Sequence, residues 1–265
     1  MASCFRSLKA VLIDLSGTLH VENDVIPGSI EALNRLRKSG LALRFVTNTT
    51  KESRSFLLSR LSSLGFDIKA EEVFTSLLAA RSLVESLKVR PYLFLEDEAL
   101  EDFQGIETDN PNAVVVGLAP SMFEYNHMNR AFRLLQDGAH LIAIHKSKYY
   151  RTKEGLSLGP GPFVEGLEFA SGQKARIVGK PAPDFFSTAL SDVGVKPEEA
   201  VMVGDDVLLD VGGALDAGLQ GILVKTGKYR EGDEGKLKQV LNTSFVVSDF
   251  AAAVDFILKE LGTQK

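Results

Sequence analysis

The chain has 265 residues, of which 45% are hydrophobic and 25% charged, the composition of an ordinary globular protein with one large or two modest domains. Its formal net charge is −5 and its pI is near 5.5, so it has no overall basic field to hold a polyanion, and nucleic acid is a poor candidate partner. The single cysteine, Cys4, excludes an internal disulfide and a multi-cysteine metal site, and we expect it to be a bystander.

The beginning of the chain does not have the pattern of a secretory signal. Residues 1–9 are followed by a short apolar run that ends at Asp14, too short for a signal-peptide core. No apolar run approaches the ~20 residues that span a bilayer. We therefore expect a soluble cytoplasmic protein that does not enter a membrane.

The first third of the chain alternates strand and helix patterns. Residues 10–13 and 41–46 are short apolar runs that end in polar residues, which is typical of buried strands. The segment between them has apolar residues at helical spacing, and we expect Ser29 to cap this helix and Gly40 to close it. A strand, a helix and a strand of this length predict a right-handed crossover between parallel neighbours. A second helix is expected over 53–64.

The middle of the chain has a separate set of elements. After a strand that begins near residue 72, further strands are expected at 92–95, 113–116 and 141–144, with a helix near 126–135. We interpret residues 78–174 as an inserted α/β domain. The core domain then consists of residues 1–77 and 175–265.

The alternation of strands and helices returns in the last third, which predicts that the core is a doubly wound, mostly parallel, Rossmann-like α/β sheet. We expect strands at 175–178, 200–203 and 221–224, and helices over 183–193, 211–217 and 250–261. Ligands of such sheets gather outside the carboxyl ends of the strands. Asp14, Thr47, Lys180 and Asp205 each follow a predicted strand.

These residue types together suit the transfer of a phosphoryl group. Asp14 is a candidate nucleophile, because a carboxylate that attacks phosphorus forms an aspartyl-phosphate that water can hydrolyse. Attack by one anion on another needs a countercharge, and the acids at positions 205, 206 and 210 are typical oxygen ligands for Mg²⁺. Lys180 offers a compact positive charge to a phosphoryl oxygen, and Thr47 and Asn48 offer a hydroxyl and an amide.

Each of these residues alone also has an ordinary structural interpretation. An Asp after a strand is commonly a turn former or a helix cap, and Thr47-Asn48 alone suits a loop. Most lysines in a Gly-Lys-Pro context such as Lys180 are solvated. The order of these groups, each at a predicted strand end, is what favours a catalytic site.

The joint pattern resembles the haloacid dehalogenase superfamily of Mg²⁺-dependent phosphatases. Its four motifs match here at residues 14–18, at Thr47-Asn48, at Lys180 and at residues 204–210. The long gap between Asn48 and Lys180 is where the subgroup with a large α/β cap inserts that cap. Several other stretches, including 46–53 and 224–229, are similar to individual members of this superfamily.

The resemblance implies a role for each matching residue. Asp14 would be both nucleophile and metal ligand, and Ser16 would bind the metal through its backbone carbonyl. Asp205 would supply the second carboxylate, supported by Asp206 or Asp210. The phosphate would be held by Thr47, Asn48, Lys180 and the backbone N–H groups of Leu15 and Ser16. A homodimer formed through the cap is also implied.

Position 16 departs from this pattern, because the superfamily usually has a second Asp there. That Asp acts as a general acid and base, and its loss costs about 10²–10⁴ in rate when the leaving group needs a proton. A leaving group that is stable as an anion, or that carries its own proton, avoids the need for an acid. Water or a residue of the inserted domain could also supply the proton, and the titratable candidates are His127, His140 and His145. Each of these histidines also has a structural interpretation.

Other segments of the inserted domain leave two interpretations open. Residues 159–162 read Gly-Pro-Gly-Pro, which is either a rigid turn or part of the substrate entrance. Lys148, Tyr149 and Tyr150 either meet substrate or pack within the domain.

Three functions remain after these observations. The first is a Mg²⁺-dependent phosphohydrolase that acts through Asp14 on small phosphorylated compounds or on activated P–O or P–N bonds. The second is a weakly active or inactive sensor or scaffold that binds phosphate and Mg²⁺, which Ser16 motivates. Carbon–halogen hydrolysis fits poorly, because that chemistry does not need the metal-binding carboxylates.

Overall fold

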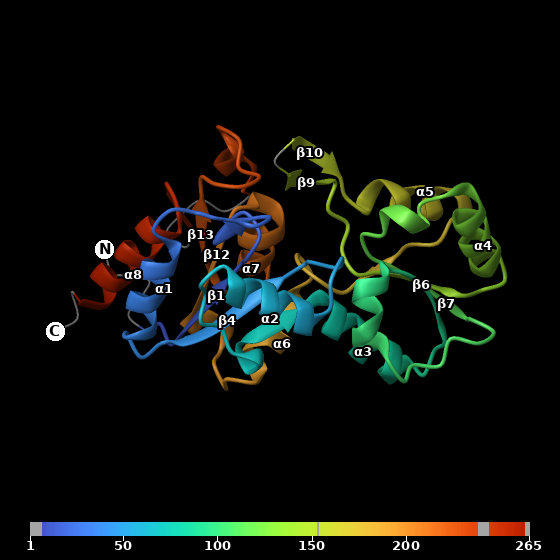
Figure 1. Ribbon diagram of the computed structural model, residues 1–265, viewed down its shortest axis with the longest axis horizontal. Helices are drawn as coiled ribbons and strands as arrows, with labels where there is room; N and C mark the ends of the chain where they lie inside the picture. Colours follow the sequence, from blue (N-terminus) through green and yellow to red (C-terminus); the bar gives the residue numbers. More distant parts are fainter. Residues whose placement is uncertain (1–6, 153, 238–243, 263–265) are drawn as a thin grey trace.

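The computed structural model describes residues 7–152, 154–237 and 244–262. Cys4 lies outside these residues. Two sheets with their own helices lie side by side along the long axis of the molecule (Figure 1). None of the helices in the described ranges is both long enough and apolar enough to cross a bilayer.

The larger sheet has six parallel strands in the order β14-β13-β12-β1-β4-β5. Its central strands are buried along their whole length, as expected for a parallel sheet that is covered on both faces. The strands are β1 (Ala10–Ile13), β4 (Ala42–Thr47), β5 (Val73–Thr75), β12 (Ala200–Gly204), β13 (Gln220–Val224) and β14 (Ser244–Val247).

Helices cover both faces of this sheet, so the predicted doubly wound fold is confirmed. Alternate residues of β1 enter different apolar clusters: Val11 and Ile13 enter one, and Ala10 and Leu12 enter the other. The first cluster includes residues of α1 (Ser29–Arg37), α2 (Arg54–Ser63) and α8 (Phe250–Gly262), and the second includes residues of α6 (Pro183–Ser191) and α7 (Gly213–Asp216).

One predicted helix cap is wrong, and a cap that was not predicted forms on the next helix. Ser29 is the first residue of α1 and not its cap; Gly28 occupies the cap position with φ of 79°, and the buried Ser29 hydroxyl has no hydrogen-bond partner among the described residues. Gly28 can adopt this left-handed conformation because it has no Cβ. Ser53 caps α2 by accepting a hydrogen bond from the Phe56 N–H.

The smaller sheet has four parallel strands in the order β11-β8-β7-β6. Its strands are β6 (Pro91–Phe94), β7 (Ala113–Val116), β8 (His140–Ala143) and β11 (Arg176–Ile177). One face packs on α3 (Ser76–Leu87), and the other on α4 (Tyr125–Gln136) and α5 (Gly161–Ser171).

The strand predicted at 175–178 lies in this smaller sheet, not in the larger one. β11 pairs with β8 through Arg176 and Ile177. An apolar run this short does not specify its sheet, because its partner is chosen by tertiary packing. We retain the division into a core and an insert at 78–174 as a proposal, with β11 added to the insert.

Two short hairpins escaped prediction and lie near the space between the sheets. They are β2–β3 (His20–Val21 and Asp24–Val25) and β9–β10 (Tyr149–Thr152 and Gly155–Leu158). In Figure 1 the second hairpin lies above the junction of the two sheets. The remaining elements are a π-helical segment at Val207–Gly212 and 3₁₀ turns at Ala70–Glu72, Asp97–Phe103, Pro120–Met122, Pro197–Glu199 and Asp233–Lys236.

Candidate active site

Polar side chains from the carboxyl ends of three core strands meet at one cavity. Asp14 follows β1, Thr47 ends β4 and Asp205 follows β12; together with Lys180 they line a cavity of about 340 Å³. A cavity therefore lies at the carboxyl ends of the strands, where a ligand was expected to bind, and these four side chains are buried in its wall.

The loop after β1 approaches Asp205 closely. The N–H of Asp14 donates to the carbonyl of Val203 at 2.9 Å, and the Thr18 hydroxyl donates to Asp14 Oδ2 at 3.3 Å. Gly17 has φ of 95°, and a Cβ at this residue would lie 2.0 Å from Asp205 Oδ2. A glycine is therefore required at position 17, both by its conformation and by the space available.

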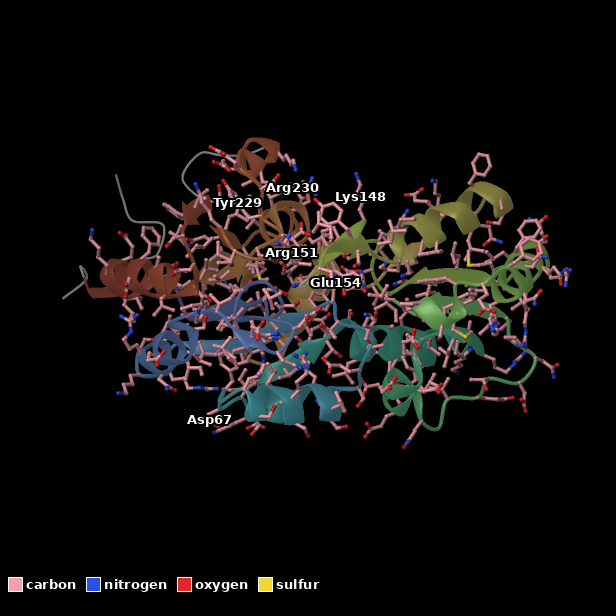
Figure 2. The ribbon with its side chains drawn as sticks, turned by 45° about the horizontal axis from the view of Figure 1, so that its top comes forward. Asp67, Lys148, Arg151, Glu154, Tyr229 and Arg230 are labelled. Atoms are coloured by element: carbon pink, nitrogen blue, oxygen red, sulfur yellow. The ribbon has the colours of Figure 1, made fainter. Side chains whose placement is uncertain are left out.

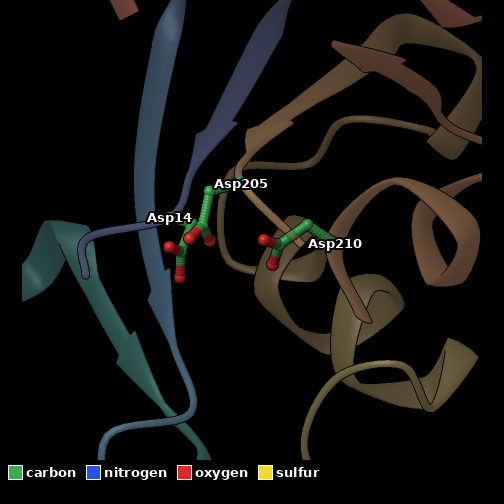
Figure 3. Close-up of side chains that lie close together, drawn as sticks. All are labelled: Asp14, Asp205 and Asp210. Atoms are coloured by element: carbon green, nitrogen blue, oxygen red, sulfur yellow. The ribbon is translucent and has the colours of Figure 1, made fainter. Parts of the chain in front are cut away.

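Three buried carboxylates form a cluster in the cavity, which Figure 3 shows in close-up. Ligand oxygens of Asp14, Asp205 and Asp210 all lie within 4.8 Å of one another. Burial raises the pKa of Asp205 well above its usual range, and the Asp14 and Asp210 charges add to the rise against the opposing effect of Lys228. Burial likewise raises the pKa of Asp210 to about 6, although Lys180 opposes the shift. Such a concentration of negative charge favours a bound cation.

Lys180 brings a positive charge into contact with this cluster. Its Nζ lies 2.6 Å from Asp14 Oδ1 and 2.7 Å from Asp210 Oδ1, and it donates to the carbonyl of Val46 at 3.1 Å. Burial by itself lowers the pKa of Lys180, but Asp14 and Asp210 outweigh burial and raise this pKa, so the ammonium stays charged.

Asp206 and Asp210 have different structural roles. Asp206 caps the π-helical segment by accepting from the N–H groups of Leu208 and Leu209 at 3.1 and 2.9 Å. Asp210 lies at the end of the first turn of that segment, and its Oδ2 accepts from the Asp206 N–H at 3.0 Å. Asp210 therefore joins the carboxylate cluster, whereas Asp206 lies at its edge.

Thr47 and Asn48 both line the cavity, but their side chains already have partners. The Thr47 hydroxyl donates to Thr49 Oγ1 at 2.9 Å and accepts from the Thr49 N–H at 3.0 Å. The side-chain amide of Asn48 bonds to the main chain of Lys180 twice, once through its nitrogen and once through its oxygen. Binding of phosphate by these two side chains stays a prediction.

Comparison with known proteins identifies the family of this chain. The sequence pattern of the haloacid dehalogenase-like hydrolases matches residues 11–107, and a second pattern of the same family, described as HAD-hydrolase-like, matches residues 177–253. The human haloacid dehalogenase-like hydrolase domain-containing protein 2 is 59% identical over 98% of this chain and 100% of its own length. The chain belongs to the haloacid dehalogenase-like hydrolases. The predicted resemblance is confirmed.

Phosphatases are prominent among the relatives of this haloacid dehalogenase-like hydrolase. The human phospholysine phosphohistidine inorganic pyrophosphate phosphatase is 41% identical over 95% of each chain. The 4-nitrophenylphosphatase from Thermotoga maritima superposes with a TM-score of 0.86 at 25% identity, covering 95% of this chain and 98% of the other. A glycerol phosphate phosphatase from Mycobacterium tuberculosis, solved in complex with magnesium, superposes with a TM-score of 0.82 at 27% identity, covering 95% and 78%. These relatives support the predicted enzyme class, a phosphatase.

Within this haloacid dehalogenase-like site, Ser16 is exposed to the cavity while its neighbour Leu15 is buried. The backbone N–H groups of Leu15 and Ser16 donate to no other residue in the described part of the chain. They are therefore available to phosphate oxygens, as the resemblance implies.

The histidines do not supply the missing acid in the way the sequence suggested. His127 bonds to the Tyr92 hydroxyl at 2.7 Å and His140 is exposed at the start of β8; neither lines the cavity. His145 does line it, 3.0 Å from the Ser147 hydroxyl, but burial and then the Lys228 and Lys180 charges lower its pKa to about 3. A neutral imidazole with so low a pKa is not a proton donor near neutral pH.

Lys228 and His20 are among the cavity residues that the sequence interpretation did not single out. Lys228 donates its N–H to Asp205 Oδ2 at 2.7 Å, and its Nζ lies 3.3 Å from Asp206 Oδ2. Burial lowers the pKa of Lys228, but the nearby aspartates outweigh burial and raise it. The available signal was its position just after β13, at the same sheet edge. His20, on the unpredicted hairpin β2–β3, has its pKa lowered by burial and donates from Nδ1 to the Glu22 carbonyl at 2.8 Å.

The hairpin β9–β10 forms part of the cavity wall from the insert. Tyr150 and Arg151 line the cavity, and the Tyr150 hydroxyl accepts from Lys51 Nζ at 3.0 Å. Arg230 of the core places its guanidinium 5.0 Å from the ring centre of Tyr149, and Figure 2 labels Arg151 and Arg230 in this region. Tyr149 and Tyr150 therefore contact the core.

The Gly-Pro run at 159–162 is only partly a turn. Gly159 lines the cavity, and a Cβ there would lie 2.2 Å from the Ser147 carbonyl. The α5 helix begins at Gly161, with Pro160 at its cap position. The first half of the run therefore shapes the cavity, and the second half starts a helix.

Proposed function

We propose that this protein is a Mg²⁺-dependent phosphohydrolase that acts through an aspartyl-phosphate on Asp14. The main observation behind the proposal is the buried contact of 2.6 Å between Lys180 Nζ and Asp14 Oδ1, inside a cavity that two further carboxylates share. A lysine in this position can neutralise both the nucleophile and an incoming phosphoryl group.

In the first step an Asp14 carboxylate oxygen attacks phosphorus. A bond from Asp14 to phosphorus forms, and the bond from phosphorus to the leaving group breaks, with its electron pair going to the leaving oxygen or nitrogen. Lys180 and the backbone N–H groups of Leu15 and Ser16, which donate to no residue in the described ranges, offset the negative charge on the phosphoryl oxygens. In the second step water attacks the same phosphorus, so that Asp14 is regenerated and inorganic phosphate is released.

The residues of the cavity fit a bound Mg²⁺. The Asp205 and Asp210 carboxylates have raised pKa values because they are buried close to another acid, and a divalent cation relieves that repulsion. Asp14, Asp205 and the Ser16 carbonyl would hold the ion, with Asp210 or Asp206 in support. The ion supplies countercharge to the phosphoryl oxygens and to the nucleophile.

Ser16 limits the substrates that suit this site. Without a carboxylic acid at position 16, a leaving group that needs a proton departs slowly. We therefore propose small phosphorylated compounds whose leaving group is already stable, as in an activated P–O or P–N bond. A purely phosphate-binding sensor is less favoured, because the nucleophile and its lysine are in contact in the cavity.

Replacement of the nucleophile tests the proposal. The purified protein is assayed with Mg²⁺ against an aryl phosphate, pyrophosphate, a phosphoramidate and an alkyl phosphate. Asp14→Asn should lower kcat by about 10³-fold or more, because loss of a covalent nucleophile removes most of the rate enhancement. Asp67→Asn is the matched control, since Asp67 is exposed on the core, well away from the junction of the two sheets (Figure 2). A wild-type rate for Asp14→Asn would refute the mechanism.

We also propose a cytoplasmic homodimer that forms through the insert. The insert carries Tyr125 on α4 and Phe169 on α5, which are 80% and 93% exposed on helices that pack together. Exposed aromatic residues of this kind are typical of association surfaces. Light scattering should report a dimer for the wild type and a monomer for Phe169→Asp; equal masses would contradict this surface.

A further inference from the structure

Asn48 bonds to the main chain of the catalytic lysine with both ends of its side-chain amide. Its Oδ1 accepts from the Lys180 N–H at 3.0 Å, and its Nδ2 donates to the Lys180 carbonyl at 2.9 Å. The two residues are 132 positions apart in the chain. This pair of bonds therefore ties the end of β4 to the segment that carries the lysine.

That segment is otherwise held by the smaller sheet. The Val178 N–H donates to the Ala143 carbonyl at 3.1 Å, and the Gly179 N–H donates to the Ile144 carbonyl at 2.8 Å. The next residue, Lys180, sends its side chain the other way, to Asp14 in the larger sheet. Lys180 is thus the point at which the chain leaves one sheet and enters the active site of the other.

Close packing keeps the Asn48 amide in place. A Cβ on Gly179 would lie 2.5 Å from Asn48 Oδ1, 2.7 Å from the Ile144 carbonyl oxygen and 2.8 Å from the Ser76 Cβ. Only a glycine lets this backbone approach the asparagine so closely. The residues that directly follow β4 and β8 therefore meet the start of α3 at this point.

We propose that Asn48 is a positioning residue for Lys180, and that its side chain acts through the lysine and not by binding phosphate. The inference rests on the proposed phosphohydrolase function. By fixing the Lys180 main chain to the core, Asn48 keeps Lys180 Nζ beside Asp14 whatever the position of the insert relative to the core. Misplacement of a reacting group by about 1 Å can cost about 10²-fold in rate. Loss of the two hydrogen bonds between Asn48 and Lys180 should therefore lower the catalytic rate.

A double-mutant cycle tests this inference, with Asn48→Ala, Lys180→Met and the combined variant assayed on an aryl phosphate. In the wild-type background Asn48→Ala should lower kcat by about 10- to 100-fold and change KM by less than about 3-fold. In the Lys180→Met background the same change should alter kcat/KM by less than about 2-fold, because residues that act as a unit are not additive. Asn34→Ala is the matched control, because Asn34 is exposed on α1 and does not line the cavity.

Two outcomes would overturn the inference. One is that Asn48→Ala lowers kcat/KM by the same factor with and without Lys180, which is the behaviour of a direct phosphate contact. The other is that it raises KM at least 10-fold with kcat unchanged. Thermal unfolding of each variant checks that it is folded. If Asn48→Ala does not fold, Asn48→Asp replaces it, since it keeps the acceptor for the Lys180 N–H and should show a smaller, equally non-additive loss.

The cycle also separates this inference from the proposed function. Absence of turnover by the wild type with every compound would count against the phosphohydrolase. Binding of inorganic phosphate with Mg²⁺ is then measured through the same cycle. If Asn48 acts through Lys180, the two changes should weaken phosphate binding non-additively, whereas additive losses would overturn the positioning role.

Discussion

Ser16 stands two residues after the proposed nucleophile and faces the cavity. Its hydroxyl cannot replace a carboxylic acid, because its proton is too tightly held near neutral pH. The buried His145 does not compensate, because its pKa of about 3 leaves it neutral. We therefore expect the enzyme to select substrates by leaving group, and a change at position 16 should reveal this.

Ser16→Asp should raise kcat on an alkyl phosphate by about 10²-fold, because it restores a proton donor for a poor leaving group. Hydrolysis of 4-nitrophenyl phosphate, whose leaving group is stable as an anion, should change much less. Steady-state kinetics on the two compounds measure the difference. Ser16→Asn is the control, since it has a similar size and no acidic proton; an equal gain with Asn would show that protonation is not the missing step.

His145 should make the stability of the protein depend on pH. Its pKa is lowered from 6.5 to about 3, so between these values the unfolded chain binds a proton that the folded chain does not. The free energy of unfolding should therefore decrease as the pH falls through this window, by up to about 1.4 kcal/mol per pH unit from this group. Other titratable groups contribute equally to the pH dependence of wild type and of His145→Gln. The difference between these two proteins therefore isolates the contribution of His145.

Urea unfolding at pH 6.5, 5.5 and 4.5 measures this effect. The stability of His145→Gln should fall less steeply than that of the wild type. NMR of the His145 ring in the wild type should show a neutral imidazole at pH 5. Parallel curves for the two proteins would contradict the role of His145.

The turn that follows β12 brings acidic groups back to the end of the strand. Asp206 caps the start of the π-helical segment Val207–Gly212. The first turn of this segment places the Asp210 side chain next to Gly204. A Cβ on Gly204 would lie 2.3 to 2.5 Å from atoms of the Asp210 side chain. The position of Asp210 in the cluster therefore depends on a strand that ends in glycine.

Gly204→Ala should displace Asp210 and weaken Mg²⁺ binding by about 10- to 100-fold, which is typical for loss of support to a metal site. The clash should also destabilise the fold by about 1–3 kcal/mol. Calorimetric titration with Mg²⁺ and urea unfolding measure the two effects. Gly166→Ala is the matched control, because a Cβ there meets nothing within 4 Å. Unchanged Mg²⁺ affinity in Gly204→Ala would exclude Asp210 from the metal site.

The cavity lies at the junction of the two sheets, and contacts from both sides enclose it. Lys51 of the core bonds to Tyr150 of the insert, Arg230 packs on Tyr149, and the Leu118 N–H donates to Thr50 Oγ1 at 2.7 Å. The walls of the cavity exclude part of the surrounding water, which strengthens the electrostatic interactions of the buried carboxylates. Whole-molecule stability should therefore respond to what occupies the acidic cluster.

Mg²⁺ should stabilise the protein at pH 7.5 and much less at pH 5. In the metal-free protein the pKa of Asp210 is about 6, above its value of 3.8 in an unfolded chain, so ionising Asp210 lowers stability as the pH rises from about 4 to above 6. Mg²⁺ reverses this by binding the ionised carboxylates, and at 100 times its Kd it adds about 2.7 kcal/mol. Below pH 6 protons compete with the ion.

Thermal unfolding with and without Mg²⁺ at the two pH values measures this prediction. Asp205→Asn should raise the metal-free Tm at pH 7.5 and remove the response to Mg²⁺, because it deletes a buried charge whose pKa is raised. An equal Mg²⁺ response at pH 7.5 and pH 5 would show that the ion binds elsewhere.

The local sequence determined the strands of the larger sheet and the edge at which the site forms. Apolar runs that end in Asp14, Thr47 or Asp205 have few alternatives to a buried parallel strand, and the carboxyl ends of such strands meet at one edge. The family was also predictable, because its motifs are short and carry specific chemistry. Lys180 was predictable as a member of the site from its motif and its position along the chain.

Tertiary structure alone decided the contacts that cross the chain. The two-residue strand β11 could join either sheet, and packing assigned it to the smaller one. The Asn48 amide bonds to Lys180 and the Lys228 N–H to Asp205, although nothing local to either residue specifies its partner. Apolar periodicity encodes burial, which is a property of each element, whereas the direction of a hydrogen bond depends on which distant groups the completed fold brings within 3 Å.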